Sequence, residues 1–150
     1  MQNVYDSKDV NEFVARINKL TPESKPEWGK MSADQMFAHI NVAYEMALED
    51  KHPKPGKFKT FIIKTLFKNI VVSEKPFKRN MKTPPEFLMV NKKEFDIEKT
   101  RLINYLNKVQ ELGGDYFHNR ESHGMGNLTK TEWNNMFAKH LDHHLKQFGV

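Results

Sequence analysis

The chain has 150 residues and a net charge of +5, and 38% of its residues are hydrophobic. This length fits one domain, residues 1–150, with a core of its own, and the composition argues against global disorder. Cysteine is absent, which excludes disulfides, thiolate metal sites and a cysteine nucleophile. No apolar run approaches the roughly 20 residues of a membrane-spanning helix, and the first residues lack a secretory-signal pattern. We therefore expect a cytoplasmic protein with no membrane partner.

Two helices are predicted in the first third of the chain. The first runs from about Ser7 to Leu20, where Ser7 can cap the free N–H groups and apolar residues recur at helical spacing. The second opens at Ser32 in "SADQMFAHINVAYEMALED", where Gln35 completes a capping box. Its apolar stripe places His39 on the face that should point inward.

Two more helices are predicted in the last third. One runs from about Phe95 to Leu112, with the glycines at 113 and 114 as its stop. The other begins at Thr129 in "TKTEW", a second capping box, and ends at Gly149. Its inward stripe consists of Trp133, Phe137, His140, Leu141, His144 and Phe148.

About forty residues separate the second helix from the third, and a connection this long can cross a bundle instead of turning tightly. Within it, "KFKTFIIKTLFKNIVV" at 57–72 predicts an extra short helix, and "KPFKRNMKTPPEF" predicts an extended loop. The expected fold is all-α: a four-helix bundle with a long crossover connection between helices two and three.

Three histidines form the candidate site. His140 and His144 are four residues apart on one helix face, so their rings can share one metal ion, and His39 offers a third ligand from another helix. Three neutral imidazoles leave a fourth position for water or substrate, as in catalytic zinc sites. Leu141 follows His140 where H-E-x-x-H enzymes have glutamate, so that mechanism is excluded. The alternative is that each inward histidine is a hydrogen-bonded core residue.

The residues around this site are assigned supporting roles. His143 lies off the centre of the stripe and is interpreted as a flanking residue, while Tyr44 and Gln147 are candidates for orienting a ligand or an imidazole. His118 and His123 are expected in an exposed glycine-rich loop, and His52 in another loop. A set of histidines suits zinc, nickel, copper or iron, of which we favour zinc or nickel as the divalent cofactor.

Three stretches carry a family resemblance: "WGKMSADQM", "TKTEW" and "KHLDHHLKQFG". They resemble the DinB-like superfamily of metal-binding four-helix bundles, and within it an uncharacterised subfamily. The resemblance implies that His39, His140 and His144 are metal ligands and that the protein is a homodimer. Characterised relatives use a divalent metal to activate a small external thiol, in thiol transfer or in isomerisation of maleylpyruvate-like acids. The ending "HLKQ" departs from their commoner His-Arg-Gly-Gln, so thiol-binding residues do not carry over.

Three functions are compatible with the sequence. The first is a metal-dependent transferase or hydrolase that acts on an unknown small molecule, with the catalytic residues unassigned. The second is a non-catalytic metal- or ligand-binding bundle, whose closed site would take a fourth protein ligand such as His143 or a carboxylate. The third assigns binding to the basic segment 51–82, which has ten basic residues and one acid, Glu74. We expect the apolar side of this segment to pack on the bundle with its lysines in solvent, and hence no nucleic-acid or membrane partner.

Overall fold

The computed structural model describes residues 1–49 and 51–150 and shows a mostly helical protein with one small two-stranded sheet. The long helices are α1 (Ser7–Asn18), α2 (Ala33–Leu48), α5 (Phe95–Phe117) and α6 (Lys130–Gln147). Shorter helical elements between α2 and α5 are α3 (Lys57–Ile62), η1 (Ile63–Phe67), α4 (Lys68–Val72) and η2 (Pro85–Phe87). The sheet is an antiparallel hairpin of β1 (Arg120–Ser122) and β2 (Gly126–Leu128).

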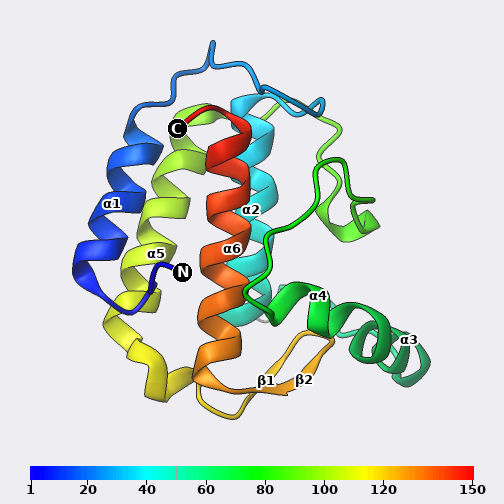
Figure 1. Ribbon diagram of the computed structural model, residues 1–150. Helices are drawn as coiled ribbons and strands as arrows, with labels where there is room; N and C mark the ends of the chain where they lie inside the picture. The colour runs from blue at the N-terminus through cyan, green and yellow to red at the C-terminus, as the bar shows by residue number, and fades with distance from the viewer. Residues whose placement is uncertain (50) are drawn as a thin grey trace.

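The four long helices lie side by side and form the helical body of the protein (Figure 1). Helices α2 and α5 run in the same direction: Asn41 hydrogen-bonds to Glu98, and Glu45, further along α2, pairs with Arg101. Because α2 ends at one end of this body and α5 begins at the other, the connection between them must return along its length, as Figure 1 shows. The connection between α2 and α5 is therefore long, as the sequence predicted, and follows the helical body from one end to the other.

The caps of the helices follow the sequence with one correction. Thr129 and Glu132 form the expected capping box of α6, and Gln35 accepts a hydrogen bond from the backbone N–H of Ser32 at the start of α2. The cap of α1 is Asp6 and not Ser7, because the Asp6 carboxylate accepts hydrogen bonds from two free backbone N–H groups of the first turn. The stretch quoted for the second helix ends at a residue, 50, that lies outside the described residues.

The region after the third predicted helix differs from the prediction. Gly113 adopts a positive φ of 72°, as a helix stop would, yet α5 resumes and continues to Phe117. This continuation brings the Phe117 ring into the core, where it packs against Trp133 at 5.5 Å between ring centroids. The hairpin that follows was not predicted, because strands of three residues are too short to show alternation of apolar and polar side chains.

A continuous core lies between the long helices. It contains the stripes expected from the helical periodicity, and its largest fully buried side chains are Trp133, Tyr44, Phe13, Phe37, Phe117 and Phe137. Stacked rings cross the centre of the body, since Tyr44 of α2 packs on Tyr105 of α5 and on Phe137 of α6. These contacts fix the position of α2 relative to α6.

The segment 57–72 is helical and exposes Lys57, Lys59 and Lys64 as predicted, but most of its large apolar side chains are exposed as well. Phe58, Phe61 and Leu66 are exposed, whereas Lys68 pairs with Glu132 of α6. The apolar side therefore does not pack on the helical body over most of its length. Among residues 1–49 and 51–150, no helix combines the length and the apolar character needed to cross a lipid bilayer.

Candidate metal centre

The rings of His39, His140 and His144 meet between α2 and α6. One nitrogen of each ring lies within 4.8 Å of the others, and Nε2 of His39 is 2.9 Å from Nε2 of His140. Ring centroids are 4.6 to 4.9 Å apart for the three pairs. At metal–nitrogen distances of about 2.0–2.1 Å, two nitrogens on one ion are separated by roughly 3 Å. The three histidines could therefore hold one metal ion.

A backbone carbonyl of the crossover orients His39. Nδ1 of His39 lies 2.8 Å from the carbonyl oxygen of Phe87 in η2. A carbonyl oxygen only accepts, so Nδ1 carries the hydrogen, and in the neutral ring the lone pair is on Nε2, which faces His140. Histidine ligands of metals generally donate their other ring N–H in this way. His39 is thus prepared to ligate through Nε2.

A chain of hydrogen bonds from the 27–29 loop orients His144. Nε2 of Gln147 donates to the carbonyl oxygen of Trp28 at 2.6 Å, which fixes the amide so that its Oε1 accepts from Nδ1 of His144 at 2.8 Å. Gly29 makes this approach possible, because it has a φ of +84° and a Cβ there would lie 2.5 Å from the Gln147 amide nitrogen. As at His39, the lone pair of His144 is on Nε2.

Burial keeps the three imidazoles neutral. It lowers the pKa of His39, and it lowers that of His144 to about 3, where proximity to His39 adds to the effect. His140 is partly exposed as a residue, yet protein atoms crowd its ring enough to bring its pKa well below the ordinary value, with His144 and His39 adding to the shift. Neutral imidazole is the form that ligates a metal, so near neutral pH these histidines need no deprotonation to bind one.

Aromatic rings of the crossover cover the histidines. The Phe87 ring lies 5.4 Å from that of His39 and 6.0 Å from that of His140. On the other side, His143 packs edge-on against His144 at 5.1 Å, and Phe77 packs edge-on against His143 at 5.7 Å. His143, predicted as a flanking residue, lies outside the group of nitrogens that could share an ion.

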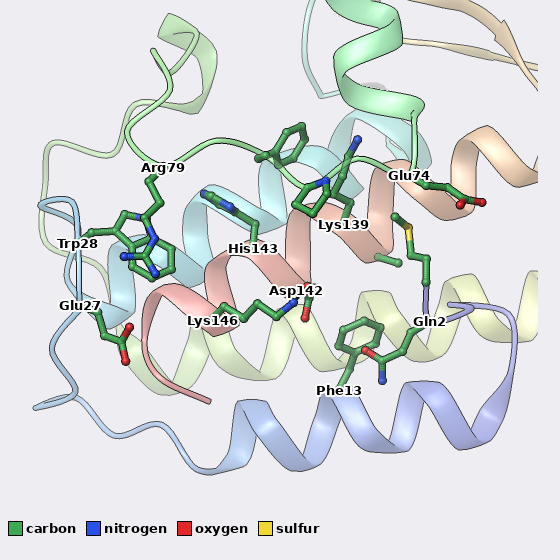
Figure 2. Close-up of a pocket in the computed structure, with 14 residues that line it drawn as sticks. Gln2, Phe13, Glu27, Trp28, Glu74, Arg79, Lys139, Asp142, His143 and Lys146 are labelled. Atoms are coloured by element: carbon green, nitrogen blue, oxygen red, sulfur yellow. Dashed lines mark ion pairs between the residues drawn. The ribbon is translucent and has the colours of Figure 1, made fainter.

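A cavity of about 670 Å³ opens on the far side of His143, between α6, α1 and the loop around Phe77 (Figure 2). Its walls include Lys139, His143 and Lys146 of α6, together with Trp28, over which the Arg79 guanidinium stacks at 4.0 Å. None of the three clustered histidines lines it. The cavity therefore adjoins the metal centre through His143 without containing it.

The remaining predicted residues lie in different places. Gln147 accepts a hydrogen bond from His144, whereas Tyr44 lies in the core between two aromatic rings. His52 hydrogen-bonds to Glu45, and His123 lies beside His52 in a separate cluster.

Sequence reasoning did not identify the two backbone carbonyls, of Phe87 and Trp28, that orient the histidines. A backbone oxygen has no side-chain signature, and its position depends on the path of the crossover and of the 27–29 loop. The only available signal was Gly29, next to Trp28 in "WGKMSADQM".

Comparison with known proteins gives a family but no activity. The model of a family described as "Protein of unknown function (DUF1569)" matches residues 2–149, nearly the whole chain. No curated protein and no solved structure matches the chain.

Proposed function

The chain belongs to this family of unknown function, and we propose from the geometry of the site that it is a divalent-metal-dependent enzyme. His39, His140 and His144 supply three ligands and leave a position for water or a small substrate. The bound ion would lower the pKa of a water molecule or of an external small thiol and so favour a nucleophile near neutral pH. The reaction class is a group transfer or a hydrolysis. Zinc or nickel suits the ligands best.

One observation carries this proposal: three imidazole nitrogens from two helices lie within 4.8 Å of one another, and two of the rings have their Nδ1 atoms occupied by acceptors. A core histidine needs a partner for each polar nitrogen. Here the Nε2 atoms of His39 and His140 face each other at 2.9 Å, an arrangement that a shared cation satisfies better than one shared proton.

The remaining residues position the ligands and exclude water. Gln147 and the Phe87 carbonyl hold two of the rings, and the Phe87 ring covers His39 and His140 on one side. A substrate would reach the open position from the side of His140, the one partly exposed member of the three. We also propose that the four long helices form a bundle with one crossover connection, the topology that the resemblance to DinB-like proteins implies.

Cobalt substitution tests the open position. The metal-free protein is loaded with Co²⁺, and its visible absorption is recorded before and after addition of 2-mercaptoethanol. We expect a thiolate-to-cobalt band, because a three-histidine site keeps a position that a small ligand can occupy. An unchanged spectrum at saturating thiol would contradict the enzymatic proposal.

A second candidate is a non-catalytic metal-binding module with a closed site. The observation that favours it is the His143 ring, which lies 5.1 Å from that of His144 and is the nearest further imidazole in the sequence. In that case His143→Ala would weaken Co²⁺ binding and shift the spectrum toward lower coordination. If the site is open, His143→Ala keeps both the affinity and the spectrum of the unaltered protein.

A further inference from the structure

The segment 57–72 has an outward apolar surface. It runs through α3, η1 and α4 as one helix, and Figure 1 shows α3 extending away from the helical body. Its large apolar side chains are Phe58 (78% exposed), Phe61 (67%), Leu66 (61%), Phe67 (48%) and Ile70 (43%). Exposed apolar residues gathered on one element, as distinct from scattered single ones, indicate a binding surface.

The spacing of these residues gives a straight stripe. Phe58, Ile62, Leu66 and Ile70 follow one another at intervals of four residues. In an α-helix, side chains four residues apart drift around the axis by about 40° at each step. The π-helical turn η1, at Ile63–Phe67, is wider than an α turn and reduces this drift. The stripe therefore stays on one face for the length of the segment.

Contacts on the opposite face hold the stripe outward. Ile63 lies over Gly124 of the hairpin, the Lys64 side chain runs along Gly126, and Lys68 forms an ion pair of 3.0 Å with Glu132.

The end of the segment is also attached to α6. Val72 is buried, its carbonyl accepts a hydrogen bond from Asn135, and Lys139 donates to the carbonyls of Ile70 and Ser73. A rotation that buried the apolar stripe would break these contacts.

Charge identifies the partner. Residues 51–82 contain ten basic residues and a single acid, Glu74, so this part of the chain carries +9 while the rest carries −4. Lys57 and Lys59 lie beside Phe58 at the outer end, and both are exposed, although Lys59 also forms an ion pair with Glu86. A twofold contact between two copies through this face would bring two such basic segments together at a cost in repulsion. An anionic surface would neutralise them.

We propose that the segment 57–72 binds the surface of anionic lipid bilayers. The aromatic and leucine side chains of the stripe enter the boundary between headgroups and acyl chains, and the flanking lysines approach the lipid phosphates. The helix lies parallel to the bilayer surface and does not cross the bilayer. This binding does not depend on the metal centre, which lies between α2 and α6. It differs from the expectation of no membrane partner, which rested on the lack of a membrane-spanning run and on the packing of this apolar side against the bundle.

Vesicle co-sedimentation tests the proposal at physiological salt. The probes are vesicles of phosphatidylcholine mixed with phosphatidylglycerol, and vesicles of phosphatidylcholine alone. The test variant is Phe58→Ser with Leu66→Ser. Its matched control is Val90→Ser with Ile97→Ser, two apolar residues that are 81% and 58% exposed outside the segment.

We expect the protein to sediment with the anionic vesicles, and the test variant to bind them at least about tenfold more weakly. The control variant should bind as the unaltered protein does, and raised salt should weaken binding by screening the lysines. Equal binding by the test and control variants would overturn the proposal.

Two other results would overturn it by naming a different partner. The first is no vesicle binding together with a dimer, measured by light scattering, that the test variant alone disrupts. The second is no vesicle binding together with retention on single-stranded DNA that the test variant alone loses.

Discussion

Helix α6 and the segment 57–72 have similar patterns in the sequence and opposite orientations in the structure. Both carry apolar side chains at intervals of three and four residues, with charged residues between them. The stripe of α6 faces α2 and α5 and includes His140 and His144, while much of the stripe of 57–72 faces outward. Periodicity shows that a helix has an apolar face. It does not show what that face contacts.

The difference arises from how each helix is attached. Helix α6 contacts α1, α2 and α5, so burial of its apolar stripe removes the most surface from water. The segment 57–72 contacts α6 near its end, through Val72, Lys68 and the Lys139 side chain that reaches from α6, and its middle contacts the hairpin. These contacts leave the other side of the segment free of the helical body.

The largest expected difference is in the free energy of unfolding, when phenylalanine is replaced by alanine in α6 and in the segment 57–72. Phe137→Ala in α6 should lower the free energy of unfolding by about 3–5 kcal/mol, because the ring is buried among other aromatic rings. Phe58→Ala should change it by less than about 0.5 kcal/mol. Denaturant unfolding of both variants measures the difference. A large loss in Phe58→Ala would show that the apolar stripe is buried in solution.

Low pH should destabilise the folded protein through the histidines that face inward. The folded-state pKa of His144 is about 3, below the ordinary value of 6.5, and those of His39 and His140 are also lowered. Above about pH 6.5 the rings are neutral in both states, and below it the unfolded chain binds protons that the folded chain excludes. The metal-free protein should therefore lose a few kcal/mol of stability as the pH falls from 6.5 toward 3. Thermal unfolding across this range measures it.

The control for the acid experiment is His144→Asn, whose stability should fall less over the same interval. An equal fall in the two proteins would contradict the assignment of this pH dependence to His144.

Lys139 connects the two regions, so its removal should affect the segment more than the helix that bears it. Its ammonium group donates to carbonyls at the end of α4, and burial lowers its pKa to about 8. Lys139→Met should cost about 1–3 kcal/mol, because the carbonyls of Ile70 and Ser73 lose a charged donor. Hydrogen exchange should rise across 57–72. Lys146→Met, which removes only an exposed ion pair with Asp142, should cost less than about 1 kcal/mol.

The smallest expected effect is a loss of metal affinity when the hydrogen bond between Gln147 and His144 is removed. Gln147→Leu removes the acceptor of His144 Nδ1, so metal affinity should weaken by about 10- to 100-fold, measured by competition with a chelating dye. Gln110→Leu on α5 is the matched control and should leave affinity unchanged. Unchanged affinity in Gln147→Leu would show that the hydrogen bond does not support the site.

Local rules predicted the parts of the fold that local interactions determine. The capping boxes at Ser32 and Thr129 are decided within four residues, and the inward positions of His39, His140 and His144 follow from helical periodicity alone. To predict that these rings meet, one further assumption was enough: that α2 packs on α6.

Long-range contacts determine what the sequence did not predict. The carbonyls of Phe87 and Trp28 reach the histidines only because of the paths of two loops. The outward orientation of 57–72 depends on Glu132 and Lys139, which are more than sixty residues away along the chain.

The metal content of protein purified without an affinity tag tests the central claim most directly. Elemental analysis should find about one divalent ion per chain in the unaltered protein and in His118→Ala, an exposed histidine outside the site. His140→Ala should retain almost none, because two of the four ligand positions would then depend on solvent. Full metal content in folded His140→Ala would contradict the account.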